Sequence, residues 1–191
     1  GIVQVAKVQP DETVAIFGCG GVGLAAIMIA KSRGARVIAI DKSNEALDRA
    51  RLAGADERVD AQFDEVVKVV RKFGDNGVNV TVDALGSVDT SRLAIESLKR
   101  LGRHVQIGLL PPAVIGDHAT IPMHRVIGHE LTVMGSHGMS AATYPDMLAD
   151  IAAGRLRPDL LIERVISLDE VPAELAAMSH ASPPGVTIIH P

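Results

Sequence analysis

Four glycines fall within six residues in the segment GCGGVG at residues 18–23, which joins an apolar run to a helical run of small residues. In the pattern G-x-G-x-x-G the first glycine allows a tight turn, the second lets a phosphate approach the backbone, and the third lets the helix pack closely on the strands. The helix N-terminus adds a partial positive charge and free N–H groups. The segment therefore predicts a site for the diphosphate of a dinucleotide, although a structural turn without a ligand is an alternative. The predicted contacts are Gly18, Gly20, Gly21, Val22 and Gly23.

An acidic residue follows the glycine segment at the distance that a dinucleotide site requires. Asp41 ends the next apolar run, eighteen positions after Gly23, close to the offset of ~20 residues expected for the carboxylate that binds the adenosine ribose. A carboxylate accepts hydrogen bonds from the ribose diol and repels a 2′-phosphate, so Asp41 predicts NAD in preference to NADP. The alternative is that Asp41 only caps the following helix, for which Ser43 is better placed. Lys42 is included in the predicted site, with its side chain expected to point to solvent.

Apolar runs alternate with helix-period segments along residues 13–136, which is the pattern of repeated β-α units and a parallel sheet covered by helices. The predicted strands are residues 13–18, 36–41, a short one around Val59, 78–85, 103–110 and 131–136. The predicted helices are residues 21–33, 43–53, 64–73 and 87–98.

Two regions depart from this alternation of strands and helices. Residues 111–130 contain too many prolines and glycines for a full helix. Beyond residue 140 the pattern predicts helices at 144–154 and 169–180 and a short last strand at 185–191. We therefore predict a nucleotide-binding domain at 1–140 and a C-terminal extension at 141–191.

The composition excludes several classes of function. The 191 residues include 19 basic and 23 acidic side chains, a net charge of −4, and no basic patch interleaved with aromatic residues, so no nucleic-acid partner is expected. No apolar run approaches the ~20 residues that span a bilayer, and the first residues do not read as a signal peptide, so no membrane partner is expected. Cys19 is the single cysteine, so no internal disulfide can form and a reducing, cytoplasmic setting is expected.

The chain resembles the medium-chain alcohol dehydrogenases along essentially its whole length. The resemblance rests on VQPDETVAIFGCGGVGLAAIMIAKSRGARVIAID at residues 8–41, and then on EALDRARLAGAD, SLKRLGRHVQIGLL and LTVMGSHG in the same order. The tail segments ISLDEVPAELAAM and GVTIIHP resemble the closing helix and strand of that family. The resemblance implies a Rossmann domain of the α/β class, a doubly wound parallel six-stranded sheet of order 3-2-1-4-5-6 with helices on both faces.

The resemblance also implies cofactor contacts at the carboxyl ends of the later strands. The implied contacts are Ala84 and Leu85 on the adenosine side, the backbone of Ile107, Gly108 and Leu109 facing the nicotinamide, and Met134, Gly135 and Ser136 facing its carboxamide. Two positions depart from the family, since Ala46 stands where many relatives have a lysine and Val186 where many have an arginine. Weaker NAD binding is the expected consequence.

The catalytic groups of such an enzyme are not expected in this chain. In the family, hydride transfer takes place against an N-terminal domain that carries the zinc ligands, the proton relay and most of the substrate pocket. A catalytic zinc needs three protein ligands and an open position, and we predict no catalytic and no metal-binding residue here. His129 lies in a Gly-His-Glu sequence like the zinc motif of the family, but in a different place, and is interpreted as a surface turn residue. Cys19 is interpreted as the variable position of the glycine segment, although a helix start can lower a thiol pKa.

Two surfaces are expected to take part in association. The segment HATIPMH, His118 to His124, matches the stretch that pairs edge to edge in dimeric relatives, which predicts a homodimer or a higher oligomer; a plain surface loop is the alternative. The tail helices are expected to turn apolar residues toward the N-terminal domain of the family, and to expose them when this chain is alone. These residues are Leu148, Ile151, Leu175 and Met178.

The sequence therefore predicts the cofactor-binding domain of a zinc-dependent, NAD-linked alcohol dehydrogenase, with NAD and a small alcohol as partners and no turnover by this chain alone. One alternative is a zinc-free relative of the quinone reductase type, against which Asp41 argues because those relatives usually take NADPH. The other alternative is a non-catalytic NAD-binding module.

Overall fold

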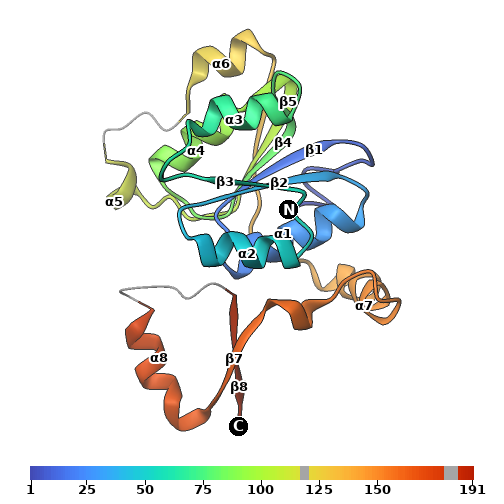
Figure 1. The fold of residues 1–191 in the computed structure, drawn as a ribbon, viewed down its shortest axis with the longest axis vertical. Helices are drawn as coiled ribbons and strands as arrows, with labels where there is room; N and C mark the ends of the chain where they lie inside the picture. Colours follow the sequence, from blue (N-terminus) through green and yellow to red (C-terminus); the bar gives the residue numbers. More distant parts are fainter. Residues whose placement is uncertain (117–120, 179–184) are drawn as a thin grey trace.

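The computed structural model describes residues 1–116, 121–178 and 185–191. Its centre is a six-stranded parallel sheet of order β3-β2-β1-β4-β5-β6 (Figure 1), which confirms the predicted Rossmann-like order. The strands are β1 (Thr13–Phe17), β2 (Arg36–Asp41), β3 (Glu57–Asp60), β4 (Val78–Asp83), β5 (Leu98–Gln106) and β6 (Thr132–Gly135). The order reverses between β1 and β4, and at such a point the loops diverge and open a crevice at the carboxyl ends of the strands.

Helices cover both faces of the sheet (Figure 1). They are α1 (Gly21–Ser32), α2 (Asn44–Leu52), α3 (Val66–Phe73), α4 (Val88–Glu96), α5 (Pro112–Ile115) and α6 (Met123–Gly128). Alternate residues of β1 enter different cores. Val14 and Ile16 pack in the cluster that contains α1 and α2, whereas Ala15 and Phe17 pack in the cluster that contains α3 and α4. A strand buried on both faces explains why the apolar runs of this sequence are continuous.

Local signals set the helix boundaries close to their predicted places. Ser43 caps α2, because its hydroxyl accepts a hydrogen bond from the Ala46 N–H at 3.2 Å. Ser87 caps α4 in a reciprocal capping box with Thr90. In the described residues of the segment rich in proline and glycine, 111–116 and 121–130, the helices are the short α5 and α6, and no full helix forms there.

The C-terminal part contains a strand, β7, that the sequence pattern did not predict. Here the chain forms α7 (Tyr144–Ala152), β7 (Ile162–Ser167), α8 (Val171–Ala177) and β8 (Val186–His190) with short 3₁₀ turns between them. Strands β7 and β8 form a separate two-stranded parallel sheet. In Figure 1 this sheet and α8 lie at the end of the molecule opposite α6.

The C-terminal part is attached to the main sheet through α1 and α2. Leu156 and Leu161 are buried in the cluster that contains α1 and α2. Arg49 of α2 forms an ion pair with Glu163 of β7, and Arg33 pairs with Asp150 at 3.2 Å.

The predicted domain boundary at residue 140 stays a prediction. Among the described residues, no helix is long and apolar enough to cross a bilayer.

Candidate dinucleotide site

The glycine segment connects β1 to α1, and each of its three pattern glycines meets a different requirement. Gly18 has a φ of +90°, and a Cβ on it would lie 3.1 Å from the Cβ of Leu85. A Cβ on Gly20 would have no heavy atom within 4 Å, so the space in front of this residue is open. A Cβ on Gly23 would collide with the Gly18 carbonyl oxygen, so only glycine lets α1 pack this closely on the strand end.

The N-terminus of α1 presents free backbone donors beside this open space. The N–H groups of Gly20, Gly21 and Val22 have no hydrogen-bond acceptor within the part of the chain that the structure describes. No side chain caps this twelve-residue helix, and no acidic residue occupies its first turn. Open space, free N–H donors and the positive end of a helix together fit a diphosphate group.

The first residues of β8 border the same helix end. A Cβ on Gly21 would lie 3.1 Å from Cγ2 of Val186 and 3.3 Å from the Gly185 carbonyl oxygen. Residue 186 therefore stands next to the glycine segment, and in this chain it contributes an apolar side chain there.

Asp41 is held at the mouth of the crevice by two backbone donors. Its Oδ2 accepts a hydrogen bond from the Cys19 N–H at 2.7 Å, and its Oδ1 accepts one from the Ser43 N–H at 2.9 Å. The carboxylate is half-buried, so its remaining lone pairs are available to further donors. Ser43 supplies the side-chain cap of α2, as expected, while Asp41 also stabilises the turn before that helix. The Lys42 side chain is exposed, as expected.

The Cys19 thiol differs from one expectation. The side chain is fully buried, and its Sγ lies 3.7 Å from the Ile40 carbonyl oxygen. Burial, followed by the nearby Asp41 charge, raises the pKa of the thiol far above its ordinary value. The helix start does not lower it, because desolvation of the thiolate outweighs the helix dipole. Its interpretation as a variable packing position, and not a nucleophile, is consistent with this burial.

The loops after β4 and β5 touch each other, backbone against backbone. A Cβ on Gly86 would collide with the Leu109 carbonyl oxygen, and one on Gly108 would collide with the Gly86 nitrogen. Leu85 and Leu109 on these loops are 61% and 74% exposed. Gly18 also contacts Leu85, so the loops after β1, β4 and β5 meet at the carboxyl ends of the strands.

Asp83, at the end of β4, is a site residue that sequence analysis missed. It is fully buried, and its Oδ1 accepts hydrogen bonds from the N–H groups of Leu85 and Gly86, both at 2.9 Å. Its Oδ2 accepts from Thr90 Oγ1 at 3.0 Å and from Gln106 Nε2 at 2.9 Å. This turn ends β4 two residues before the predicted end at residue 85. An aspartate directly after an apolar strand, with a glycine three residues later, is the signal that could have indicated it.

The remaining predicted residues also lie at the carboxyl ends of the strands. Ile107 and Gly108 donate their N–H groups to the Asp83 carbonyl oxygen at 2.9 and 2.8 Å. Ala84 is half-buried and donates its N–H to the Phe17 carbonyl oxygen at 2.9 Å. At β6, Met134 and Ser136 are half-buried and Gly135 is exposed. All fifteen predicted residues thus lie at or just beyond the carboxyl ends of the strands. Their contact with a cofactor stays a prediction.

In the part of the chain that the structure describes, no group of three or more His, Cys, Asp or Glu side chains is arranged to hold a metal ion. His129 ends α6 and is half-buried, with its Nε2 2.8 Å from Nη1 of Arg125. Burial, followed by the neighbouring arginines, lowers the pKa of His129. His118 and His180 lie outside the described residues.

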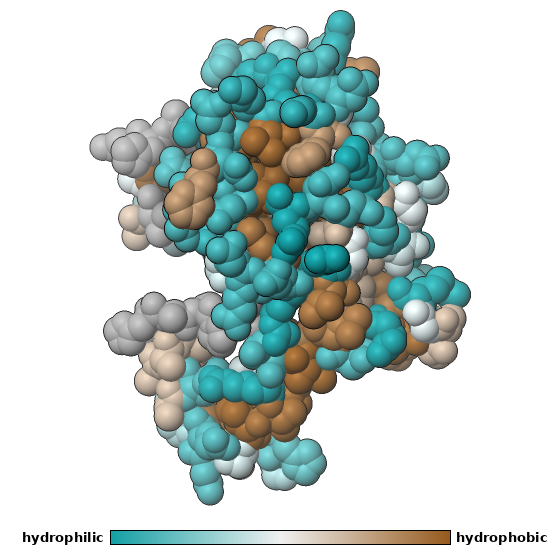
Figure 2. All heavy atoms as spheres, in the orientation of Figure 1, coloured by the Kyte–Doolittle hydropathy of each residue, from teal (hydrophilic) through white to brown (hydrophobic). Residues whose placement is uncertain are grey.

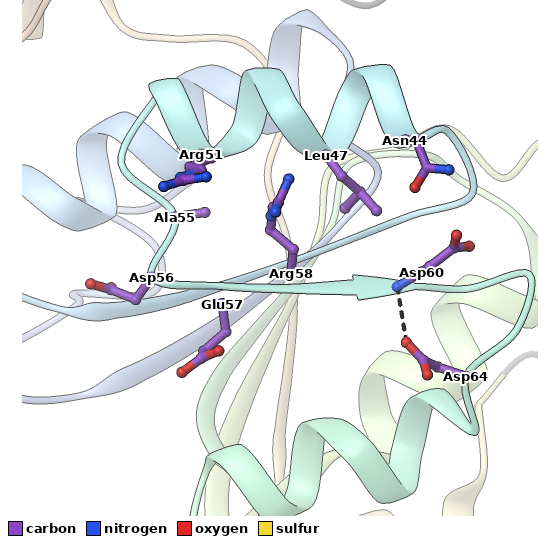
Figure 3. A pocket seen from close by; sticks show the side chains of 9 residues that line it. All are labelled: Asn44, Leu47, Arg51, Ala55, Asp56, Glu57, Arg58, Asp60 and Asp64. Atoms are coloured by element: carbon purple, nitrogen blue, oxygen red, sulfur yellow. Dashed lines mark hydrogen bonds between the residues drawn. The ribbon is translucent and has the colours of Figure 1, made fainter.

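A hollow of about 540 Å³ lies between α2 and β3 (Figure 3), and no residue of the glycine segment lines it. Its lining residues are Asn44, Leu47, Arg51, Ala55, Asp56, Glu57, Arg58, Asp60 and Asp64. Several of its charges are already paired, because Arg58 contacts Asp48 and Asp56 contacts Lys31. Charged residues along β3 suit an edge strand that must not pair with another chain.

The strand order, the glycine segment and the acidic end of β2 define a nucleotide-binding domain of the Rossmann-like α/β class. A comparison with protein families matches residues 21–153 to the zinc-binding dehydrogenases. The chain belongs to this family and corresponds to its nucleotide-binding domain.

Known relatives agree with this assignment. The chain is 33% identical to the alcohol dehydrogenase class-3 of Myxine glutinosa over 174 residues, which are 88% of this chain and 46% of that protein. Among solved structures, 2R,3R-butanediol dehydrogenase from Bacillus subtilis superposes with a TM-score of 0.86 at 26% identity, covering 97% of this chain and 52% of the other. The alcohol dehydrogenase from Aeropyrum pernix gives 0.81 at 30% identity, covering 97% and 52%. This chain therefore spans about half the length of these relatives.

Proposed function

We propose that this chain is the NAD-binding domain of an NAD-dependent alcohol dehydrogenase, which transfers a hydride between an alcohol and the nicotinamide of NAD. The observation that carries the proposal is the fixed position of Asp41 beside the open glycine segment and the free N–H groups of α1. The cofactor supplies the hydride chemistry, while the protein contributes binding and orientation.

Each part of the site has a task in this proposal. The N–H groups of Gly20, Gly21 and Val22 bind the diphosphate, and Asp41 accepts hydrogen bonds from the adenosine ribose. Because the backbone donors of Cys19 and Ser43 already orient the carboxylate, little freedom is lost when the ribose binds. A 2′-phosphate would meet the same carboxylate as a like charge, so NADP binds less well.

The catalytic zinc and the alcohol pocket belong, in this proposal, to a part of a longer protein outside residues 1–191. The zinc-free reductase alternative is weaker because Asp41 opposes NADPH. For the homodimer, the support is that β6 forms one edge of the sheet and that Ile121 and Met123 nearby are 39% and 53% exposed. Part of the pairing segment, residues 117–120, lies outside the described residues. The single, buried cysteine suits the proposed cytoplasmic setting.

Calorimetric titration of NAD and NADP into the wild-type chain and Asp41→Ser tests the proposal. We expect NAD to bind more tightly to the wild type, and Asp41→Ser to reduce that preference by about tenfold, the scale of a lost charged hydrogen bond. Asp169→Ser, in the C-terminal part, makes the same change in net charge and should leave the preference unchanged. Equal wild-type affinity for the two dinucleotides would refute the role of Asp41, and alcohol turnover by the chain alone would refute the placement of the catalytic groups.

A further inference from the structure

Gln106 occupies the last position of β5, directly before the loop at residues 107–109. Both polar atoms of its side chain are within hydrogen-bond distance of other residues. The Nε2 donates one hydrogen bond to Oδ2 of Asp83 at 2.9 Å and one to the carbonyl oxygen of Gly108 at 2.9 Å. The Oε1 lies 3.1 Å from Nε2 of His104. A single half-buried side chain thus connects the end of β4, the loop after β5 and the interior of the sheet.

The direction of these hydrogen bonds follows from the donors that are available. Asp83 and the Gly108 carbonyl can only accept, so they require the NH₂ of Gln106, and its Oε1 must accept from His104. His104 therefore carries its hydrogen on Nε2, and its Nδ1 accepts from the Thr81 hydroxyl at 3.0 Å. His104 is fully buried, and burial lowers its pKa, which keeps the ring neutral in this arrangement. The amide of Gln106 is thus held in one orientation from within the sheet.

The same hydrogen bonds fix the backbone at Gly108 on both sides. Its N–H donates to the Asp83 carbonyl oxygen at 2.8 Å, while its own carbonyl accepts from Gln106. On the other side, the Asp83 carboxylate orients the loop after β4 through Leu85 and Gly86. Because the two loops also touch at Gly86 and Gly108, a shift of one requires a shift of the other.

We infer that Gln106 is a positioning residue for the nicotinamide end of the bound dinucleotide. It sets the backbone of residues 107–109 and, through Asp83, links this segment to the loop after β4 on the adenosine side. The inference rests on the proposed function, which places the nicotinamide beside residues 107–109. Gln106 itself need not touch the cofactor.

Replacing Gln106 with methionine keeps the length of the side chain and removes every hydrogen bond that it makes. Gly108 loses one of its two restraints, so the loop samples other positions and the nicotinamide loses contacts. The adenosine side keeps Asp41, the glycine segment and the bonds from Asp83 to Leu85 and Gly86. The loss should therefore be selective for ligands that contain the nicotinamide.

Calorimetric titration of NAD and of ADP-ribose, which lacks the nicotinamide, measures this selectivity. The wild type should bind NAD more tightly than ADP-ribose. Gln106→Met should weaken NAD roughly three- to tenfold, the scale of one lost hydrogen bond, and ADP-ribose much less. Thr90→Val is the control: it removes another bond to Asp83 Oδ2 together with the bond from the Ser87 N–H in the capping box of α4, both on the α4 side, and should leave the ratio of the two affinities unchanged.

Amide hydrogen exchange provides a readout that needs no ligand. The Ile107 and Gly108 amides should exchange faster in Gln106→Met than in Thr90→Val, in proteins whose circular dichroism shows the same fold. Equal weakening of both ligands, no weakening, or unchanged exchange at these amides would overturn the inference, as would a wild type that binds NAD no more tightly than ADP-ribose. A wild type that binds neither ligand would instead refute the proposed function.

Discussion

Gly20 and Gly23 lie three residues apart, and the structure gives them opposite reasons for being glycine. Around Gly20 there is open space, whereas Gly23 faces the carbonyl oxygen of Gly18. In the proposed function the open space at Gly20 receives the diphosphate, whereas glycine at position 23 allows the close packing of α1. The sequence pattern places a glycine at both positions because it reflects a local strand–turn–helix geometry, and the ligand contact of Gly20 stays a prediction.

This difference leads to a paired prediction. Gly20→Ala should unfold in urea like the wild type, because its Cβ enters empty space, but should weaken NAD binding by about tenfold or more, since the methyl occupies diphosphate space. Gly23→Ala should lose about 3 kcal/mol or more of unfolding free energy through overpacking against the backbone. The measurements are urea unfolding and NAD titration of both variants. A stable Gly23→Ala, or a Gly20→Ala that binds NAD normally, would contradict this assignment.

At the scale of elements, β4 and β5 are joined by a buried polar pair as well as by their backbone ladder. Thr81 and His104 are partners in the register, and their side chains are hydrogen-bonded inside the sheet. Burial lowers the pKa of His104, although the Gln106 hydrogen bond and the Asp83 charge partly oppose this. The folded sheet therefore favours the neutral form of His104.

The stability of the sheet should depend on pH for this reason. Below the ordinary histidine pKa of about 6.5, the unfolded chain binds a proton that folded His104 does not, so the unfolding free energy should fall as the pH decreases from 7 toward the lowered pKa. His104→Gln should show a smaller decrease in urea unfolding between about pH 7 and pH 5. Because the pKa of His129 is also lowered, the double variant with His129→Gln should flatten the profile further. An identical pH profile for His104→Gln and the wild type would exclude this role.

Prediction of the elements succeeded where the signal is local and failed where it is not. The caps at Ser43 and Ser87 and the apolar runs of the main sheet lie within each element. Strand β7 was missed because its sequence, IERVIS, has no regular alternation of polar and apolar residues and becomes a strand by pairing with β8, at the other end of the C-terminal part. The extra length of β5 before Arg103 likewise depends on its partner β4.

At the scale of the whole molecule, exposed apolar side chains occur in both parts of the described chain and are most densely spaced beyond residue 138. Figure 2 shows apolar surface in the region of β7 and β8. Val165 of β7 is 59% exposed, and Leu148 of α7 and Leu175 of α8 are 56% and 63% exposed. Of the four residues expected to face the N-terminal domain, Ile151 alone is half-buried in the core cluster. Exposed apolar surface of this kind favours association.

We therefore expect the chain alone to self-associate as its concentration rises, as measured by sedimentation velocity. The double variant Val165→Thr, Leu175→Gln should reduce this association, since it removes two of the exposed apolar side chains and keeps the strand and helix propensities. Leu52→Gln is a control on α2, in the main-sheet part of the chain, where Leu52 is 68% exposed, and it should have no effect. If Leu52→Gln reduced association as much as the double variant, the C-terminal surface would not be its cause.

The sequence by itself determined the order of the elements in the main sheet, the glycine segment, the acidic residue Asp41 at the end of β2 and the family resemblance, because each depends on residue types and short spacings along the chain. Only the tertiary structure decided how Asp83, Gln106 and His104 are linked, why the pKa of Cys19 is raised, and that β7 pairs with β8. These properties depend on burial and on contacts between strands far apart in the sequence, and no short pattern encodes them.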